Sequence, residues 1–144
     1  KMNKPECKTY TGGTKEWYLN GKLHREDGPA YEGANGSKEW YLNGKYHRED
    51  GPAIELANGD KVWYLNGKRH REDGPAFDFT DGYKEWRLND KLHREDGPAY
   101  EYSNGEKGWY LNHEQVDPET IVDLWLAKNI YCFYNVETNS LEFE

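Results

Sequence analysis

Residues 40–53 read Trp-Tyr-Leu-Asn-Gly-Lys-Tyr-His-Arg-Glu-Asp-Gly-Pro-Ala, and near-copies of this stretch fill most of the 144-residue chain. The heptapeptide His-Arg-Glu-Asp-Gly-Pro-Ala occurs unchanged at 24–30, 47–53, 70–76 and 93–99. Tryptophan recurs with the same interval of 23 residues, at Trp17, Trp40, Trp63, Trp86 and Trp109. Self-similarity at a fixed period of this size is typical of an array of one supersecondary unit. The sequence therefore predicts a repeat array.

Two turn signals in each copy predict that the unit is built from β-hairpins. Asn-Gly or Asp-Gly stands at 35–36, 58–59, 81–82 and 104–105, and Asn-Gly follows Trp-Tyr-Leu at 20–21, 43–44 and 66–67. These dipeptides tolerate the positive φ of tight hairpin turns. Asp90 and His113 replace the second glycine in the last two copies, so those turns should be slightly strained. The predicted fold is all-β, a solenoid-like stack of antiparallel hairpins.

The pairing register of the first hairpin is open. A two-residue turn at Asn35-Gly36 places Glu32 opposite Glu39, an unfavourable like-charge pair, and a bulge is the alternative. Lysines with the same 23-residue interval are expected to lie along the sheet and to screen the acids of the neighbouring strand: Lys15, Lys38, Lys61, Lys84 and Lys107. Because hydrophobic residues make up 35% of the chain and aromatics 15%, the core is expected to consist of a few large rings.

The repeats are expected to span residues 1–113, with a cap at 114–144. Asp117 is a natural N-cap and Pro118 suits the first helical position, which predicts a helix at about 118–128. Its apolar face would cover the end of the stack, with Trp125 and Phe133 in the core. Two short strands are expected at 131–136 and 141–144. Cys7 and Cys132 are interpreted as free thiols, although a link between the chain ends is an alternative.

The charge is unevenly distributed along the chain. The net charge is −8, of which residues 114–144 carry −6 and residues 1–113 carry −2. This balance opposes binding to nucleic acid or to an anionic membrane, because both require a basic face. It favours a protein partner with a basic surface. The chain has no apolar stretch typical of a signal peptide or membrane span, so a cytoplasmic protein is expected.

Tyr41-Leu42-Asn43-Gly44-Lys45-Tyr46-His47, followed by Gly51 and Asn58-Gly59, resembles the MORN repeat over roughly residues 8–113. The copies are most similar to a divergent form that carries His-Arg-Glu-Asp-Gly-Pro-Ala, found in bacteriophage and bacterial proteins. The resemblance implies a hairpin stack and a scaffolding or interaction role. MORN repeats proper have His-Gly-x-Gly here, and this chain lacks the basic surface that phospholipid binding requires.

The repeated polar residues raise the question of chemistry. His, Glu and Asp lie within four residues of one another, which suggests metal ligation or acid–base catalysis. An enzyme normally uses one asymmetric constellation, whereas each group here occurs four times in the same context. We therefore expect a structural role: Asp-Gly-Pro forms a turn, and the arginine pairs with an acid of its own or the adjacent loop. No metal, cofactor or catalytic residue is expected.

Three sets of residues are candidates for binding. The first comprises the repeated loop residues Arg25, Arg48, Arg71, Arg94, His24, His47, His70 and His93. The second comprises residues that differ between copies, Tyr46, Arg69, Phe79 and Tyr102, because stacking does not determine them. The third is the acidic group Asp117, Glu119 and Asp123 of the cap, a possible dock for a basic protein.

The leading functional hypothesis is a non-catalytic protein-binding module, phage-encoded according to the resemblance and acting against a bacterial host defence protein. An alternative is a sponge that sequesters a nucleotide-like or sugar ligand between aromatic faces and the arginine loops. A third hypothesis is a metal-dependent hydrolase that uses His and Glu of adjacent loops.

Overall fold

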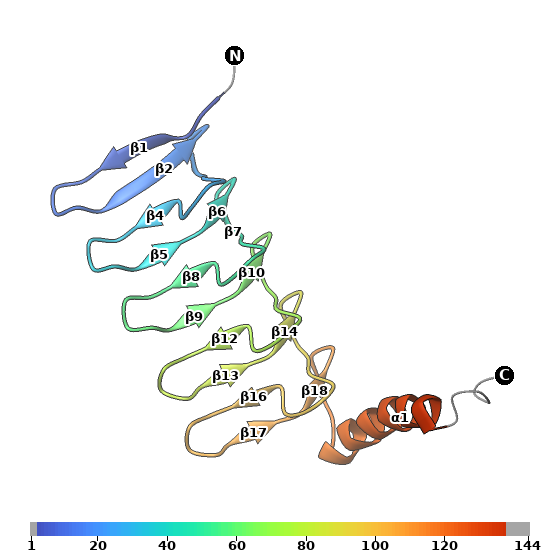
Figure 1. The fold of residues 1–144 in the computed structure, drawn as a ribbon. Coiled ribbons are helices and arrows are strands. Elements are labelled where there is room, and N and C mark those ends of the chain that lie inside the picture. The colour runs from blue at the N-terminus through green and yellow to red at the C-terminus, as the bar shows by residue number, and fades with distance from the viewer. Residues whose placement is uncertain (1–2, 138–144) are drawn as a thin grey trace.

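The computed structural model describes residues 3–137, with side chains through residue 130. The chain forms an elongated stack of β-hairpins with the N-terminus at one end and a single helix at the other (Figure 1). This confirms the predicted all-β hairpin stack. Two columns of strands run along the stack. The first contains β1 (Glu6–Thr9), β2 (Lys15–Leu19), β4 (Tyr31–Glu32), β5 (Lys38–Glu39), β8 (Ile54–Glu55), β9 (Lys61–Val62), β12 (Phe77–Asp78), β13 (Lys84–Glu85), β16 (Tyr100–Glu101) and β17 (Lys107–Gly108).

The second column is made of short, tight hairpins. Its strands are β3 (Lys22–Leu23), β6 (Tyr41–Leu42), β7 (Lys45–Tyr46), β10 (Tyr64–Leu65), β11 (Lys68–Arg69), β14 (Arg87–Leu88), β15 (Lys91–Leu92), β18 (Tyr110–Leu111) and β19 (Glu114–Gln115). The first column is one continuous antiparallel sheet, whereas β6-β7, β10-β11, β14-β15 and β18-β19 are separate two-stranded sheets. Each repeat thus adds one hairpin to each column. The array extends to Gln115, two residues beyond the expected boundary, because β19 still pairs with β18.

The register of the continuous sheet pairs opposite charges. Glu32 lies opposite Lys38, and Tyr31 lies opposite Glu39, because five residues rather than two connect β4 and β5. On its other side Glu32 lies opposite Lys15. The same alternation of Lys with Glu or Asp continues along the sheet to Lys107. The expected screening of acids by the repeated lysines is confirmed, and the like-charge pair is avoided.

The tight hairpins turn through left-handed residues, as the Asn-Gly signal predicted. Asn43 has φ 51° and Gly44 has φ 77°. Asp90 takes the glycine position with φ 69°, a conformation that costs a side-chain-bearing residue about 1 kcal/mol or more. Its carboxylate compensates by accepting hydrogen bonds from the backbone N–H and the Nε of Arg69, at 3.0 and 2.6 Å. The strained turn therefore gains a contact with the preceding repeat.

The buried core is thinner than expected. The fully buried hydrophobic residues of the array are small: Ala30, Ala53, Ala76 and Ala99 are 0% exposed. Their carbonyl groups accept hydrogen bonds from the backbone N–H of Trp17, Trp40, Trp63 and Trp86 respectively. Among the described residues no large side chain is fully buried. The prediction that large rings form the core is wrong in this respect, because the tryptophans are half-buried at the surface of a layer one sheet thick.

The C-terminal cap differs from its prediction. Helix α1 (Pro118–Glu137) begins where predicted but continues nine residues past Lys128, so the strand predicted at 131–136 is wrong. The side-chain amide of Asn129 donates to the carbonyl of Trp125 (2.8 Å) and so stays within the helix rather than ending it. Trp125 is 49% exposed instead of lying in the core, because α1 points away from the stack (Figure 1). Ile121 alone of its residues through 130 is buried. The side chain of Phe133 and residues 138–144, with the second predicted strand, lie outside the described part.

Candidate binding face

Each His-Arg-Glu-Asp-Gly-Pro-Ala loop is folded over a tryptophan by its arginine. In the third repeat the guanidinium of Arg71 lies 3.8 Å from the ring centroid of Trp63. Its Nε donates to Asp73 (2.9 Å) and its Nη1 donates to the carbonyl of Pro75 (3.1 Å). The same three contacts recur for Arg25, Arg48 and Arg94. The predicted pairing of the arginine within its own loop is confirmed. The hydrogen bonds and stacking contacts of the arginines stabilise the loops.

The invariant glycine of the loop makes room for this arrangement. A Cβ added to Gly74 would lie 2.8 Å from the Cζ of Arg71, closer than carbon atoms approach. Any side chain there would displace the guanidinium from Trp63. The glycine of the motif is therefore favoured by packing, because it leaves room for the stacked guanidinium.

The histidines connect successive repeats. The backbone N–H of Asn89 donates to the Nδ1 of His70 (3.0 Å) across one repeat interval, and the same bond joins His24 to Asn43, His47 to Asn66 and His93 to Asn112. An imidazole that accepts at Nδ1 is neutral and carries its proton on Nε2. In His24 and His70 the Nε2 lies 3.9 and 3.8 Å from the nearest glutamate oxygen, too far for a hydrogen bond. Within the part of the chain that the structure describes, neither Nε2 donor has a hydrogen-bond acceptor.

Grooves lie between neighbouring loops. One groove of about 630 Å³ has Trp63, Leu65 and His70 as its floor and loop residues 48–52 and 71–73 as its walls. The next, of about 550 Å³, has Trp86, Leu88 and His93 as its floor and is closed at the end of the array by Trp125 and Lys128 of α1. A groove at the N-terminal end has Trp17, Leu19 and His24 in the same positions, but residues 3–5 take the place of the second loop. We call this series the inter-loop grooves.

The walls of these grooves carry an uncompensated negative charge. Within each loop the arginine and the aspartate neutralise each other, which leaves the glutamate. The side chains of Glu26 and Glu72 are 82% and 84% exposed. Glu95 is the exception, because it accepts a hydrogen bond from Lys128 (2.5 Å) and lies 3.2 Å from His93. These two partners hold the pKa of Glu95 below its ordinary value of 4.5.

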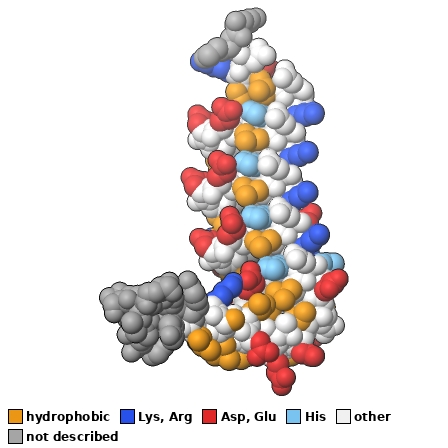
Figure 2. Space-filling view, turned by 90° about the vertical axis from the view of Figure 1, so that its right-hand side faces the viewer, with side chains coloured by type: hydrophobic (Ala, Val, Ile, Leu, Met, Phe, Trp, Pro, Cys, Tyr) orange, Lys and Arg blue, Asp and Glu red, His pale blue; other side chains and the backbone are white. Residues whose placement is uncertain are grey.

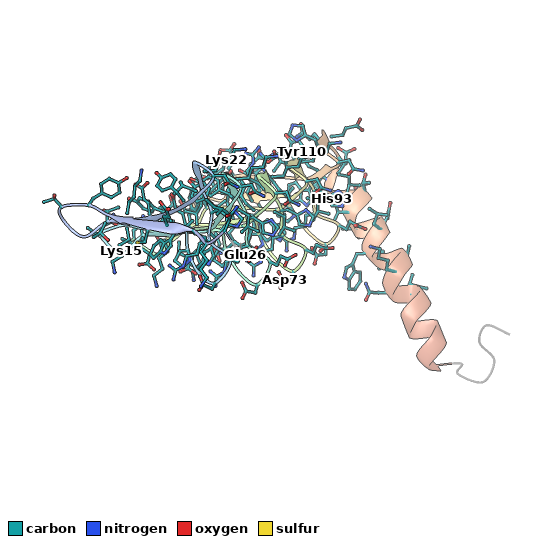
Figure 3. All side chains as sticks on the ribbon, turned by 90° about the horizontal axis from the view of Figure 1, so that it is seen from above. Lys15, Lys22, Glu26, Asp73, His93 and Tyr110 are labelled. Atoms are coloured by element: carbon teal, nitrogen blue, oxygen red, sulfur yellow. The ribbon has the colours of Figure 1, made fainter. Side chains whose placement is uncertain are left out.

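This face of the stack has a regular pattern of side chains. A column of histidine alternating with hydrophobic side chains is flanked on one side by acids and on the other by basic side chains (Figure 2). Leu65, on a groove floor, pairs with the exposed Lys68, and Leu19 pairs with Lys22 in the same way. The acidic row, which includes Glu26, Glu49 and Glu72, lines the grooves, whereas Lys22 of the basic row lies on the opposite side of the stack (Figure 3).

The opposite face of the sheet is aromatic. Seen along the stack, Tyr110 lies on one side of the sheet and Glu26 and Asp73 on the other (Figure 3). Rings contact one another from repeat to repeat, with centroid distances of 4.9 Å for Tyr46 and Tyr64 and 4.8 Å for Tyr83 and Tyr102. Within one repeat the rings of Phe77 and Phe79 are 5.7 Å apart, and the guanidinium of Arg69 lies 5.8 Å from the Phe77 ring.

A half-buried glutamate, Glu39, and a buried one, Glu85, lie under this aromatic face. Glu39 accepts hydrogen bonds from the hydroxyl groups of Tyr41 and Tyr46. Burial, hydrogen bonding to Tyr46 and the charge of Glu39 raise the pKa of Tyr41 well above its usual range. In the fourth repeat Arg87 replaces this tyrosine and pairs with Glu85, which is 7% exposed. The third repeat has Val62 and Tyr64 instead. On this face, a change at one position from repeat to repeat is thus matched by a change in its contact partner.

The structure separates the three predicted sets of site residues. The arginines and histidines lie along the inter-loop grooves, whereas Tyr46, Arg69, Phe79 and Tyr102 come together on the aromatic face. Asp117, Glu119 and Asp123 are exposed at the beginning of α1. Sequence reasoning missed the groove floors, Leu65 and Leu88, and the connecting rings Tyr64, Phe77 and Tyr83. Their recurrence every 23 residues was a signal in the sequence. Which side of the sheet each side chain occupies depends on the strand register, which the sequence left open.

Among the described residues no group of His, Cys, Asp and Glu is arranged to hold a metal ion. No helix within residues 3–137 has the length and apolar character needed to cross a bilayer. No protein-family model matches the chain, and no match is found among curated protein sequences. Fold and site together define the class of protein as a stacked β-hairpin repeat protein with one grooved, charged face and one aromatic face.

Proposed function

We propose that this chain is a non-catalytic protein-binding module that holds a basic polypeptide against its inter-loop grooves. The observation that carries the proposal is the state of the loop glutamates. Arginine, aspartate and histidine of each loop are engaged in intramolecular contacts, whereas Glu26 and Glu72 extend into solvent at 82% and 84% exposure. The acidic row is thus the part of the motif that is free to meet a partner.

The floors of the grooves support the same proposal. Tryptophan, leucine and histidine lie beneath the acids, and interfaces that hold a peptide commonly combine an apolar floor with a charged rim. A basic side chain can place its aliphatic stem on the floor and its charge at the wall. The alternative of a nucleotide or sugar sponge needs an aromatic face that is free beside a free guanidinium, whereas in each groove the arginine is itself stacked on the tryptophan.

The resemblance to phage and bacterial repeat proteins directs the search for the partner to a bacterial lysate, and we propose a bacterial defence protein as one partner. Affinity capture at low salt, with quantitative mass spectrometry, compares three forms of the protein. The first is the unchanged chain and the second carries Glu26→Gln, Glu49→Gln and Glu72→Gln. The third carries Glu106→Gln, Glu114→Gln and Glu119→Gln, which removes the same charge elsewhere.

The proposal predicts a captured protein that is lost from the first triple variant and retained by the second. Circular dichroism checks that both variants keep the fold, which is expected because none of the six glutamate side chains makes a hydrogen bond among the described residues. Capture that is equal for all three forms, or lost only when Glu114 and Glu119 are changed, contradicts the proposal. The second result would assign binding to the acidic cap.

A further inference from the structure

The inter-loop grooves repeat at a fixed distance along the stack. Each repeat contributes two strands to the continuous sheet, and neighbouring strands lie about 4.8 Å apart, so successive grooves are separated by roughly 9.5 Å. Whatever binds several grooves at once must present the same group at this interval.

A polyproline II helix has this interval. It rises about 3.1 Å per residue with three residues per turn, so every third side chain points in the same direction at intervals of about 9.3 Å. A β-strand fits less well, because side chains on one face are separated by about 6.7 Å. An α-helix also fits less well, because it returns to the same face after about 5.4 Å, which is much shorter than the distance between grooves.

The grooves also provide the polar groups that such a chain requires. A polyproline II helix has no internal hydrogen bonds, so its carbonyl groups are free to accept from a protein donor. His24 is 8% exposed and lines the N-terminal groove, and no acceptor among residues 3–130 lies within hydrogen-bond distance of its Nε2. His70 offers the same donor in the groove between the second and third loops.

The two charged rows determine on which side a bound chain must carry its basic residues. Seen along the stack, Glu26 lies on one side and Lys22 on the other (Figure 3). The equivalent residues of the next repeats, Glu49, Glu72, Lys45 and Lys68, are exposed as well, and each lysine pairs with a leucine. A ligand that is cationic all around is attracted by one row and repelled by the other. A chain whose basic residues all lie on one side meets only the acids.

From this geometry we infer that the ligand of the grooves is an extended polypeptide in the polyproline II conformation with a basic residue at every third position. The inference rests on the proposed function, since it specifies the basic partner. Each basic side chain occupies one groove beside a loop glutamate, and the intervening carbonyl groups accept from the histidine Nε2 donors. The distance between repeats thereby selects the spacing of charged residues along the partner.

Three fluorescently labelled peptides test the inference, each with five lysines: (Lys-Pro)5, (Lys-Pro-Pro)5 and (Lys-Pro-Pro-Pro)5. Their high proline content favours the polyproline II conformation in all three. They carry the same charge and differ in its spacing and in length. Fluorescence anisotropy with the full chain should show (Lys-Pro-Pro)5 binding at least about tenfold more tightly than the other two, because only it engages several grooves simultaneously. The triple variant Glu26→Gln, Glu49→Gln and Glu72→Gln should abolish this preference, and Glu106→Gln, Glu114→Gln and Glu119→Gln should keep it.

Equal affinity for the three peptides overturns the spacing rule and leaves a charge-driven module, so the proposed function survives. No binding by any peptide overturns the inference as well, and the capture experiment, which uses a natural partner, then decides the proposed function independently. Preferential binding of (Lys-Pro)5 would show that the grooves do not select charge at every third residue and would also overturn the inference.

Discussion

The backbone N–H of Asn89 donates a hydrogen bond to the Nδ1 of His70, 3.0 Å away and one repeat earlier in the chain. This bond links two of the separate tight hairpins, which have no continuous sheet to join them. The repeated histidine is therefore an acceptor between repeats, and its recurrence has a structural cause.

Replacing His70 should weaken the contact between the third and fourth repeats. His70→Ala removes the acceptor and is expected to lower the free energy of unfolding by about 1 kcal/mol, the usual worth of such a bond. Urea denaturation followed by circular dichroism measures the change. His113→Ala serves as the comparison and should cost less, because its bond to the N–H of Leu92 is longer, at 3.3 Å. Equal effects of the two substitutions would argue against this role of His70.

Arg71 should not tolerate replacement by lysine. Lysine keeps the charge but cannot stack its planar group on Trp63 while donating to both Asp73 and Pro75. Arg71→Lys should therefore cost about 2 kcal/mol of stability. The exposed Lys68→Arg is the matched control and should be nearly neutral. A neutral Arg71→Lys would show that the stacked arginine contributes only its charge.

The pair Glu85 and Arg87 should be replaceable by the residues of the preceding repeat. Glu85→Val alone leaves a largely buried guanidinium without its partner and should cost about 3 kcal/mol. The double variant Glu85→Val with Arg87→Tyr reproduces Val62 and Tyr64 and should recover most of this loss, since apolar replacements of buried ion pairs are often neutral. Denaturation of all three forms provides the test. A double variant less stable than Glu85→Val would contradict the equivalence of these positions.

Acid should release helix α1 from the array. Lys128 and His93 depress the pKa of Glu95, so its contact contributes stability above the ordinary value of 4.5 and loses it as the pH falls through the folded-state pKa. The contact is complete at neutral pH and declines only below about pH 4.5. The indole resonance of Trp125, which lines the groove beside Lys128, reports the change by NMR. In the Glu95→Gln variant at neutral pH, this resonance should already have the chemical shift that the unchanged protein shows at low pH.

Much of the fold could be predicted because its signals are local. The Asn43-Gly44 turn and the 23-residue interval of the lysines follow from backbone sterics and strand geometry. The register could not be predicted, because it depends on a five-residue turn in which Asn35 Oδ1 accepts from the N–H of Ser37 (3.0 Å). The extent of α1 was also missed, because Asn129 is a poor helix former whose amide here stays within the helix.

The candidate site was harder to predict than the fold. Sequence reasoning ranked Arg71 and His70 together as possible ligand groups, although Trp63 and Asn89 already engage them in the structure. The stacking partner lies eight residues away and the hydrogen-bond partner lies nineteen, so neither is a local signal. Glu72 has the same recurrence as its neighbours and is as exposed as Asp73, at 84% and 88%. It differs in that Asp73 accepts a hydrogen bond from Arg71, whereas the Glu72 side chain makes none among the described residues.

The central claim is that the grooved face, rather than the aromatic face or the cap, binds a basic polypeptide. The most direct measurement is the NMR spectrum of the isotope-labelled full chain titrated with (Lys-Pro-Pro)5. We predict that the indole resonances of Trp63 and Trp86 and the amide resonances of residues 70–75 shift together. Shifts centred on Phe79, Tyr83 and Tyr102, or on the first turn of α1, would contradict the claim.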